Sequence, residues 1–332
     1  MKPTIAISMG DFNGVGPEVV LKHLSNLDLS SSTPVIIGSE TVFQFYEKSL
    51  NIYVDRHRIS GTSDIKEDSV NMMSISDIDE ADIQQSKITK KAGLASMKAV
   101  EYGINSCLAG QTDALVTAPI SKEAIHKAGY NYPGHTEFLA EKTGTELVTM
   151  ILATDQLRVG LLTGHIPIKE VAGSINSNDI ICKIESLEKS LRENFGINHP
   201  NIAVMGLNPH AGDGGVLGSE ETNYIQPAVN EVQNKGIDAE GPFPADGFFG
   251  SRKHTQYDAI LAMYHDQGLI PFKALSFGKG VNFTAGLPII RTSPDHGTAF
   301  NIAGQNKANP DSFTSAYDLA VKMALIKINR KN

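Results

Sequence analysis

The sequence is poor in cysteine and has no tryptophan: Cys107 and Cys182 are the only thiols among its 332 residues. Two widely separated cysteines exclude a disulfide framework and a cysteine-rich zinc site, and they fit a reducing compartment. No apolar run approaches the roughly 20 residues of a membrane-spanning helix. The first residues lead into a strand-like segment rather than a secretory signal, so we expect a cytoplasmic protein with no membrane partner.

Basic charge is also scarce in this chain. Lysine and arginine number 29 against 37 aspartates and glutamates, which gives a net charge of −8. A negative surface argues against nonspecific binding to nucleic acid, so we expect no nucleic-acid partner. It still allows a local basic pocket for an anionic substrate. Hydrophobic residues make up 41% of the chain, which is enough for a substantial core.

Three common motifs are missing. Gly14 and Gly16 begin a G-x-G-x-x-G pattern, but Val19 stands where the third glycine would be. The Gly-Lys pair at 278–279 is followed by glycine rather than serine or threonine, so no Walker A loop is present. No G-x-S-x-G nucleophile elbow occurs either. The sequence therefore gives no motif support for a Rossmann dinucleotide site, a P-loop NTPase or an α/β hydrolase.

Short apolar runs alternate with amphipathic stretches of helical length, which predicts an α/β fold with parallel strands and helices on both faces of the sheet. The long helix expected at 90–109 and the last helix are assigned to one lobe, made of residues 1–125 and 275–332. Residues 126–274 then form an inserted second lobe. The predicted strands are 4–8, 33–38, 70–74, 113–117, 147–153, 157–163, 201–206, 257–262 and 280–285. The predicted helices are 16–26, 40–50, 90–109, 136–143, 176–195, 220–235 and 311–329.

A histidine follows each of three predicted strands: His165, His210 and His265. Ligands in open α/β sheets bind beyond the carboxyl ends of the strands, and imidazoles are frequent ligands of divalent metals. Three neutral ligands would leave the charge of the metal and one coordination position available to a substrate oxygen. Ordinary loop histidines are the alternative, and these residues form no local metal motif.

Asp213 and Asp266 lie in the loops of His210 and His265, and Asp246 lies in a separate segment. Asp213, Asp246 and Asp266 are candidates for a general base or for partners of metal ligands. The alternative for each is a turn or helix-capping role.

Five further residues suggest an anion pocket. His135 and Thr136 precede or begin a helix, where backbone N–H groups attract anions, although Thr136 would also suit an N-cap. Lys273, Asn282 and Arg291 interrupt apolar sequence, and a buried cation is costly unless an anion meets it. A structural ion pair is the alternative. The residues alone thus indicate an α/β enzyme with a candidate three-histidine metal site and an anion pocket.

Three stretches, 206–212, 264–273 and 286–300, resemble the 4-hydroxythreonine-4-phosphate dehydrogenase family of the vitamin B6 pathway. The likeness extends over nearly the whole chain. It implies the fold of isocitrate and isopropylmalate dehydrogenases, with two α/β/α lobes and a cleft between them. It also implies a homodimer with the active site near the subunit interface, and NAD or NADP bound without a Rossmann fingerprint. The first lobe would be the cofactor side, and the second would carry the metal site and dimer contacts.

The resemblance also implies roles for individual residues. The implied metal ligands, at a site shared between subunits, are His165, His210 and His265. The implied substrate-binding residues are His135, Thr136, Lys273, Asn282 and Arg291. The implied cofactor loop is His296, Gly297, Thr298 and Ala299. The chain departs from the family pattern at Phe12-Asn13, Gly247 and Asn301, which bears on the exact substrate and on the choice between NAD and NADP.

The reaction implied is a metal-dependent oxidation of 4-phosphohydroxy-L-threonine to 2-amino-3-oxo-4-phosphobutanoate, which decarboxylates to 3-amino-2-oxopropyl phosphate. The metal would be zinc, cobalt or magnesium, and the base Asp246, Asp266 or Lys273. One alternative is a dehydrogenase of a phosphorylated sugar acid, such as D-erythronate or D-threonate 4-phosphate. Others are a three-histidine zinc hydrolase and a noncatalytic protein that binds a phosphorylated metabolite.

Overall fold

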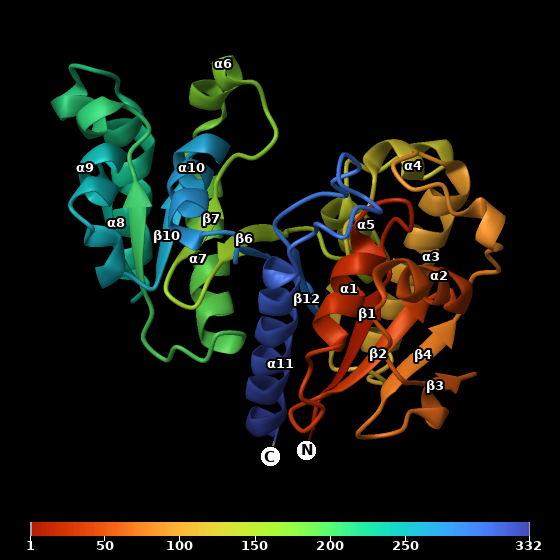
Figure 1. Ribbon diagram of the computed structural model, residues 1–332. Coiled ribbons are helices and arrows are strands. Elements are labelled where there is room, and N and C mark those ends of the chain that lie inside the picture. The colour runs from red at the N-terminus through yellow and green to blue at the C-terminus, as the bar shows by residue number, and fades with distance from the viewer. Residues whose placement is uncertain (1, 332) are drawn as a thin grey trace. The chain divides into compact units, whose positions relative to one another are not determined.

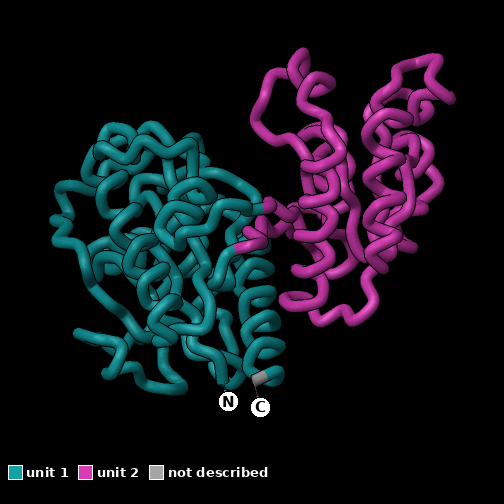
Figure 2. Tube along the Cα trace, turned by 180° about the vertical axis from the view of Figure 1, so that it is seen from behind, with its two compact units in different colours: residues 1–148, 287–332 teal, residues 149–286 magenta. Residues whose placement is uncertain are grey.

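A computed structural model describes residues 2–331, and the chain divides into two compact units (Figure 2). Unit 1 comprises residues 1–148 and 287–332, and unit 2 comprises residues 149–286. The sequence pattern predicted both boundaries between the units earlier in the chain, near residues 125 and 275. The first lies later because α4 (Lys122–Lys127) and α5 (His135–Thr143) pack against α3 (Lys90–Leu108) of unit 1. The second lies later because β11 (Val281–Ala285) pairs with β6 (Thr149–Ala153) in unit 2.

The strands of unit 1 run parallel in the order β3-β4-β2-β1-β5-β12. Nearly every residue of the central strands is buried, as expected for a parallel sheet covered on both faces. Helix α1 contacts both α2 and α11, and helix α3 contacts both α4 and α5, so two groups of helices accompany the sheet (Figure 1). The strand bounds are β1 Thr4–Ser8, β2 Thr33–Gly38, β3 Arg56–Ile59, β4 Val70–Ser74, β5 Ala114–Thr117 and β12 Ile290–Pro294. The remaining helices are α1 Gly16–Leu24, α2 Glu40–Leu50 and α11 Asp311–Lys331.

The strands of unit 2 follow the order β11-β6-β7-β10-β8-β9. Strand β6 is antiparallel to both of its neighbours here, so this part of the sheet departs from the parallel βαβ units that the sequence pattern predicted. A connection as short as the one from Ala153 to Arg158 makes a hairpin and leaves no room for a crossover helix. The other strands are β7 Arg158–Leu161, β8 Asn201–Met205, β9 Asp238–Phe243 and β10 Ala259–Ala262. The helices are α6 Ile168–Val171, α7 Ser177–Glu193, α8 Gln226–Asn234, α9 Ala245–Gly250 and α10 His265–Ser276.

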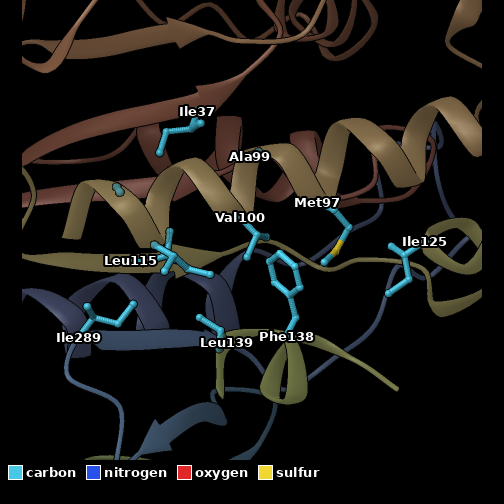
Figure 3. Packing of buried hydrophobic residues seen from close by; sticks show 11 residues of the cluster. Ile37, Met97, Ala99, Val100, Leu115, Ile125, Phe138, Leu139 and Ile289 are labelled. Carbon is cyan, nitrogen blue, oxygen red and sulfur yellow. The ribbon is translucent and has the colours of Figure 1, made fainter. Parts of the chain in front are cut away.

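Each unit has its own hydrophobic core. In unit 1, Val100 of α3 packs with Leu115 of β5 and Phe138 of α5 (Figure 3). In unit 2, Leu161 and Phe272 belong to a second cluster. Fully burying such a side chain contributes about 1.5–3 kcal/mol, so these clusters can hold the loops at the strand ends in place. No helix among residues 2–331 is long and apolar enough to cross a membrane.

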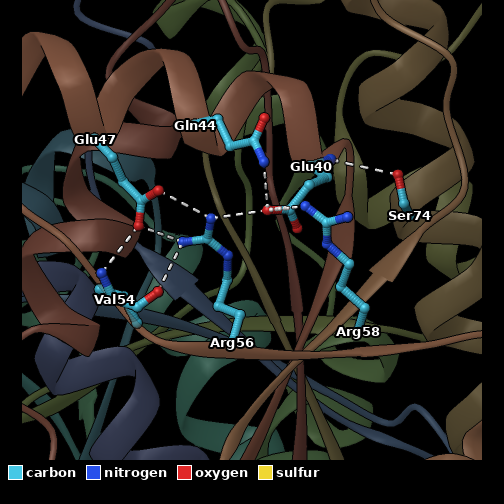
Figure 4. A network of polar contacts seen from close by, with 7 residues as sticks. All are labelled: Glu40, Gln44, Glu47, Val54, Arg56, Arg58 and Ser74. Carbon is cyan, nitrogen blue, oxygen red and sulfur yellow. Dashed lines mark hydrogen bonds and ion pairs between the residues drawn. The ribbon is translucent and has the colours of Figure 1, made fainter.

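Strand β3 is a polar edge strand held by charge. Arg56 donates from Nη1 to Glu47 at 2.5 Å and from Nη2 to Glu40 at 3.0 Å, and both carboxylates belong to α2 (Figure 4). Arg58 lies 3.4 Å from Glu40 but is mostly exposed. The sequence Arg-His-Arg-Ile has no apolar alternation, which is why the pattern did not predict this strand.

Candidate active site

The three candidate metal histidines of unit 2 follow neighbouring strands. Strands β7, β10 and β8 pair in parallel, so their carboxyl ends meet at one edge of the sheet. His165 follows β7, His210 lies in the loop after β8, and His265 is the first residue of α10 after β10. The topology therefore brings all three to the same end of unit 2.

His165 and His265 lie side by side. Their ring centroids are 5.7 Å apart, with the planes inclined by 42°. Two imidazoles bound to one tetrahedral zinc have ring centres about 5 Å apart, so a small adjustment would let both bind one cation. His265 Nδ1 lies 2.7 Å from Oδ1 of Asp266, a carboxylate contact that orients the ring and leaves its other nitrogen for a ligand. Both rings line a pocket of about 280 Å³.

His210 faces a second pocket of about 570 Å³, which Asp246, Asp266 and Tyr264 also line. Because Tyr264 and Asp266 line both pockets, the two spaces adjoin. Even so, residues 2–331 contain no group of three or more His, Cys, Asp or Glu placed to hold a metal ion. The chain by itself brings together His165 and His265, and His210 as the third ligand stays a prediction.

The donor atoms available here suit a divalent cation. Imidazole nitrogen with nearby carboxylate oxygen is a combination that zinc and cobalt accept, and carboxylate and water suit magnesium. The residues present therefore fit the metal that the sequence implied.

His210 belongs to a strained turn. Residues 210–214 all have positive φ, and His210 itself has φ 53° and ψ 28°. Such a conformation costs an L-residue roughly 1–2 kcal/mol, so the surrounding contacts must hold it. Asp213 lies on the same turn, with φ 44°, and is exposed.

In unit 1, His135 lies within the electrostatic influence of the buried guanidinium of Arg291. Arg291 on β12 is 1% exposed and donates from Nε and Nη2 to the hydroxyl of Thr117 on β5, at 3.1 and 2.7 Å. Burial lowers the pKa of Arg291 to about 9. Burial, and then the charge of Arg291, lower the pKa of His135 well below its usual value. Nε2 of His135 is buried and makes no hydrogen bond, which leaves a polar atom for a ligand.

Helix α5 begins at this environment. Gly134 is its N-cap, and Thr136 lies inside the first turn, so the capping alternative for Thr136 does not hold. A helix N-terminus beside a buried guanidinium suits a carboxylate or phosphate group.

The other two candidate substrate residues lie in unit 2. Lys273 is exposed in the last turn of α10. Asn282 lies on β11, and its Oδ1 is buried without a hydrogen bond. The sequence-predicted substrate residues are thus divided between the units.

The candidate cofactor loop of unit 1, 296–299, contacts the loop after β1. Val15 N donates to Thr298 O at 3.0 Å. A Cβ on Gly14 would lie 2.7 Å from the same oxygen, so only glycine allows this close approach. Nε2 of His296 is buried and unbonded, which fits a loop that completes its contacts with a bound ligand.

Sequence reasoning missed several residues that shape these sites. Thr117, Glu221 and Gln267 hold functional segments through side-chain hydrogen bonds. Gln267 stands within the 264–273 stretch that carried the family resemblance, but only the structure shows which backbone groups it binds.

Comparisons with known proteins show the family to which the chain belongs. The sequence model of the family described as "Pyridoxal phosphate biosynthetic protein PdxA" matches residues 30–320. A 4-hydroxythreonine-4-phosphate dehydrogenase from Bacteroides thetaiotaomicron is 45% identical over 322 residues, covering 96% of this chain and 88% of that protein. A D-threonate 4-phosphate dehydrogenase from Pectobacterium atrosepticum is 38% identical, covering 98% of this chain and 100% of that protein.

Solved structures give the same result. The crystal structure of 4-hydroxythreonine-4-phosphate dehydrogenase from Klebsiella pneumoniae has a TM-score of 0.89 at 37% identity, covering 98% of each chain. Isocitrate dehydrogenase from Methylococcus capsulatus, at 12% identity and a TM-score of 0.50, covers 100% of this chain and 88% of that one, and shares the fold alone. The predicted fold class is confirmed. The chain belongs to the pyridoxal phosphate biosynthetic protein PdxA family and is a dehydrogenase.

Proposed function

We propose that the chain uses NAD or NADP and a divalent metal to oxidise 4-phosphohydroxy-L-threonine. The product is 2-amino-3-oxo-4-phosphobutanoate, which loses carbon dioxide to give 3-amino-2-oxopropyl phosphate in pyridoxal 5′-phosphate biosynthesis. The observation that best supports the metal-dependent chemistry is the pair of adjacent imidazoles, His165 and His265, at the carboxyl edge of the unit 2 sheet.

Three histidines would hold the metal: His165, His265 and His210. A bound zinc, cobalt or magnesium ion would supply Lewis acidity that lowers the pKa of the substrate hydroxyl. Asp266 contacts His265 through Nδ1 and so holds that ring in one orientation.

A carboxylate is the best-placed candidate for the general base. Asp246 and Asp266 are exposed and line the same pocket as His210. Either can accept the proton of a hydroxyl bound there. Lys273 lies eight residues along α10 from His265, about 12 Å away along the helix axis, which favours a role in binding a substrate anion.

Buried polar groups would orient substrate and cofactor. Arg291, with His135 and Thr136, would bind a phosphate or carboxylate, and Lys273 and Asn282 of unit 2 remain candidates for substrate binding. The loop 296–299 would bind the nicotinamide cofactor, whose own chemistry accepts the hydride.

We also propose a homodimer with the active site near the subunit interface. Unit 2 exposes large apolar side chains beside its histidine-bearing elements, and such surfaces mark protein contacts. The most exposed of them are Ile168, Val216, Ile270 and Phe277, at 73, 79, 66 and 85%.

A second candidate substrate is D-threonate or D-erythronate 4-phosphate. The relative from Pectobacterium atrosepticum, which is named D-threonate 4-phosphate dehydrogenase, supports this alternative. The two substrate classes differ at C2, where one carries an amino group and the other a hydroxyl. The zinc-hydrolase and binding-protein alternatives lose their support because the family is one of dehydrogenases.

Parallel assays test the proposal. Purified protein is given NAD or NADP with 4-phosphohydroxy-L-threonine or 4-phosphoerythronate, and reduced nicotinamide is followed by its absorbance. We expect the amino-acid substrate to give the higher kcat/KM, and a chelator to abolish the signal until zinc, cobalt or magnesium is restored. A higher kcat/KM for the sugar acid would identify that compound as the substrate in place of the amino acid. Full activity in the presence of chelator would contradict the proposed metal dependence.

A further inference from the structure

The loop that carries His210 begins with three residues, Gly206 to Asn208, whose backbone is held by two side chains. Gln267 donates from Nε2 to the carbonyl oxygen of Gly206 at 2.6 Å. Glu221 accepts hydrogen bonds from Leu207 N at 2.8 Å and from Asn208 N at 2.7 Å. Consecutive backbone groups are thus fixed before the chain reaches the histidine.

Glu221 also supports the left-handed turn that follows. Its side chain is buried, and Oε2 accepts a hydrogen bond from Nδ2 of Asn208 at 2.9 Å. A Cβ on Gly212 would lie 2.6 Å from the same oxygen, so the turn wraps closely around this carboxylate. The strained conformation of His210 therefore has a buried, hydrogen-bonded support.

Gln267 connects this loop to the element that carries His265. Its Oε1 accepts from Met263 N at 2.7 Å, just before α10, while its Nε2 bonds to Gly206 at the end of β8. Gln267 itself is two residues beyond His265, in the first turn of α10. One side chain therefore links the ends of the neighbouring strands β8 and β10.

We propose that Gln267 is a positioning residue that fixes both the His210 loop and the start of α10, and thereby sets the affinity of the site for its divalent cation. The inference rests on the metal site of the proposed function. The inference holds whether His210 and His265 bind the same cation or belong to metal sites in different subunits. In either case each histidine needs a fixed position. Groups that support metal ligands typically change affinity 10- to 100-fold when they are lost.

Cobalt binding tests this inference directly. Gln267→Leu is similar in size and removes both hydrogen bonds. Gln233→Leu is the matched control, because Gln233 Nε2 donates to the Ala239 carbonyl at 2.7 Å elsewhere in unit 2. Co²⁺ is titrated into the metal-free full-length protein and followed by its visible absorption. We expect binding about 10- to 100-fold weaker for Gln267→Leu and unchanged for Gln233→Leu.

A second variant decides the matter if Gln267→Leu does not fold. Gln267→Glu keeps an acceptor for Met263 N but places an oxygen against the Gly206 carbonyl, so we expect similarly weakened binding. Wild-type Co²⁺ affinity in a folded Gln267 variant would overturn the positioning role. His210→Ala separates this failure from that of the proposed function. If His210→Ala also keeps wild-type affinity, the metal assignment fails, and the positioning inference fails with it.

Discussion

At the residue scale, two arginines of the chain have pKa values that burial shifts in the same direction, but their surroundings differ. Burial lowers the pKa of Arg291 and of Arg158. Arg158 donates to the carbonyls of Asp258 and Asp155, so its charge is used within unit 2. Arg291 lies beside Thr117 and His135 at the start of α5, an environment suited to an anion.

Arg291→Met should chiefly raise the KM for the phosphorylated substrate. Losing a charge-assisted hydrogen bond costs about 1.5–3 kcal/mol, which corresponds to roughly a 10- to 150-fold effect. Initial rates of nicotinamide reduction measure it, and Arg158→Met is the matched control, with an expected KM near that of the wild type. Equal KM values in the two variants would contradict the anion-binding role.

Asp11 predicts a specific pH dependence of stability. Its side chain is buried, Oδ1 accepts from Asn13 N at 2.9 Å, and Oδ2 has no hydrogen bond. Burial raises its pKa from 3.8 to about 6, against a smaller lowering effect of backbone N–H groups. The folded state therefore holds a proton that the unfolded state releases at lower pH. The stability that Asp11 contributes is present below pH 3.8 and is lost as the pH rises through about 6.

Asp11→Asn should remove this loss. Relative to wild type, the free energy of unfolding of the variant should increase by about 2 kcal/mol between pH 4 and pH 7. Urea unfolding at a series of pH values measures the difference. Asp28→Asn is the control, because hydrogen bonds from Ser30 lower the pKa of Asp28 and predict the opposite sign. A wild-type minus variant difference independent of pH would show that Asp11 titrates normally.

At the scale of elements, the sequence predicted the apolar strands and amphipathic helices but missed elements that depend on tertiary contact. Helix α10 contains Gly268 and Pro271, two residues that weaken a helix, so no helix was predicted there. In the structure a Cβ on Gly268 would lie 2.8 Å from Val159, so glycine allows α10 to pack closely on β7. Burial of Phe272 adds to this contact. Such a gain cannot be read from local propensity.

Strand β3 depends on ionic contacts with α2 in the same way. The side chains of Arg56 and Glu47 are only 6% and 10% exposed. Breaking a buried pair costs about 3 kcal/mol, because the remaining charge stays buried. Arg56→Met should therefore lower the free energy of unfolding by about that amount. Arg58→Met should change it by less than about 1 kcal/mol, because Arg58 is 69% exposed. Urea unfolding of both variants measures these changes in stability. Equal effects would contradict a stabilising role for the buried ion pair between Arg56 and Glu47.

At the scale of the whole molecule, the sequence identified residues at the right strand ends but could not show how they assemble. The order β7-β10-β8 arises from long-range pairing, and it alone makes His165 and His265 neighbours. The position of His210 depends on a left-handed turn. Glu221 supports this turn by accepting a hydrogen bond from Leu207 N, although the two residues are fourteen positions apart in the chain. Neither arrangement leaves a local spacing that a sequence motif could detect.

Mixing inactive variants tests whether the metal site is shared between subunits. His165 and His265 lie together in one chain, so we expect His210 to come from the partner. His210→Ala and His265→Ala should each be inactive alone. In the proposed homodimer, random pairing makes half of the dimers mixed, and one site in each mixed dimer keeps all its ligands. About a quarter of wild-type activity should therefore return.

The matched control mixes His165→Ala with His265→Ala. Both ligands must then come from the same chain, so no activity should return. Native mass spectrometry shows in each mixture that mixed dimers have formed. If they have formed and the His210→Ala and His265→Ala mixture stays inactive, all three ligands belong to one chain. The loop that carries His210 would then have to move towards His165 and His265 when the cation binds, because the three do not form one group in the described part of the chain.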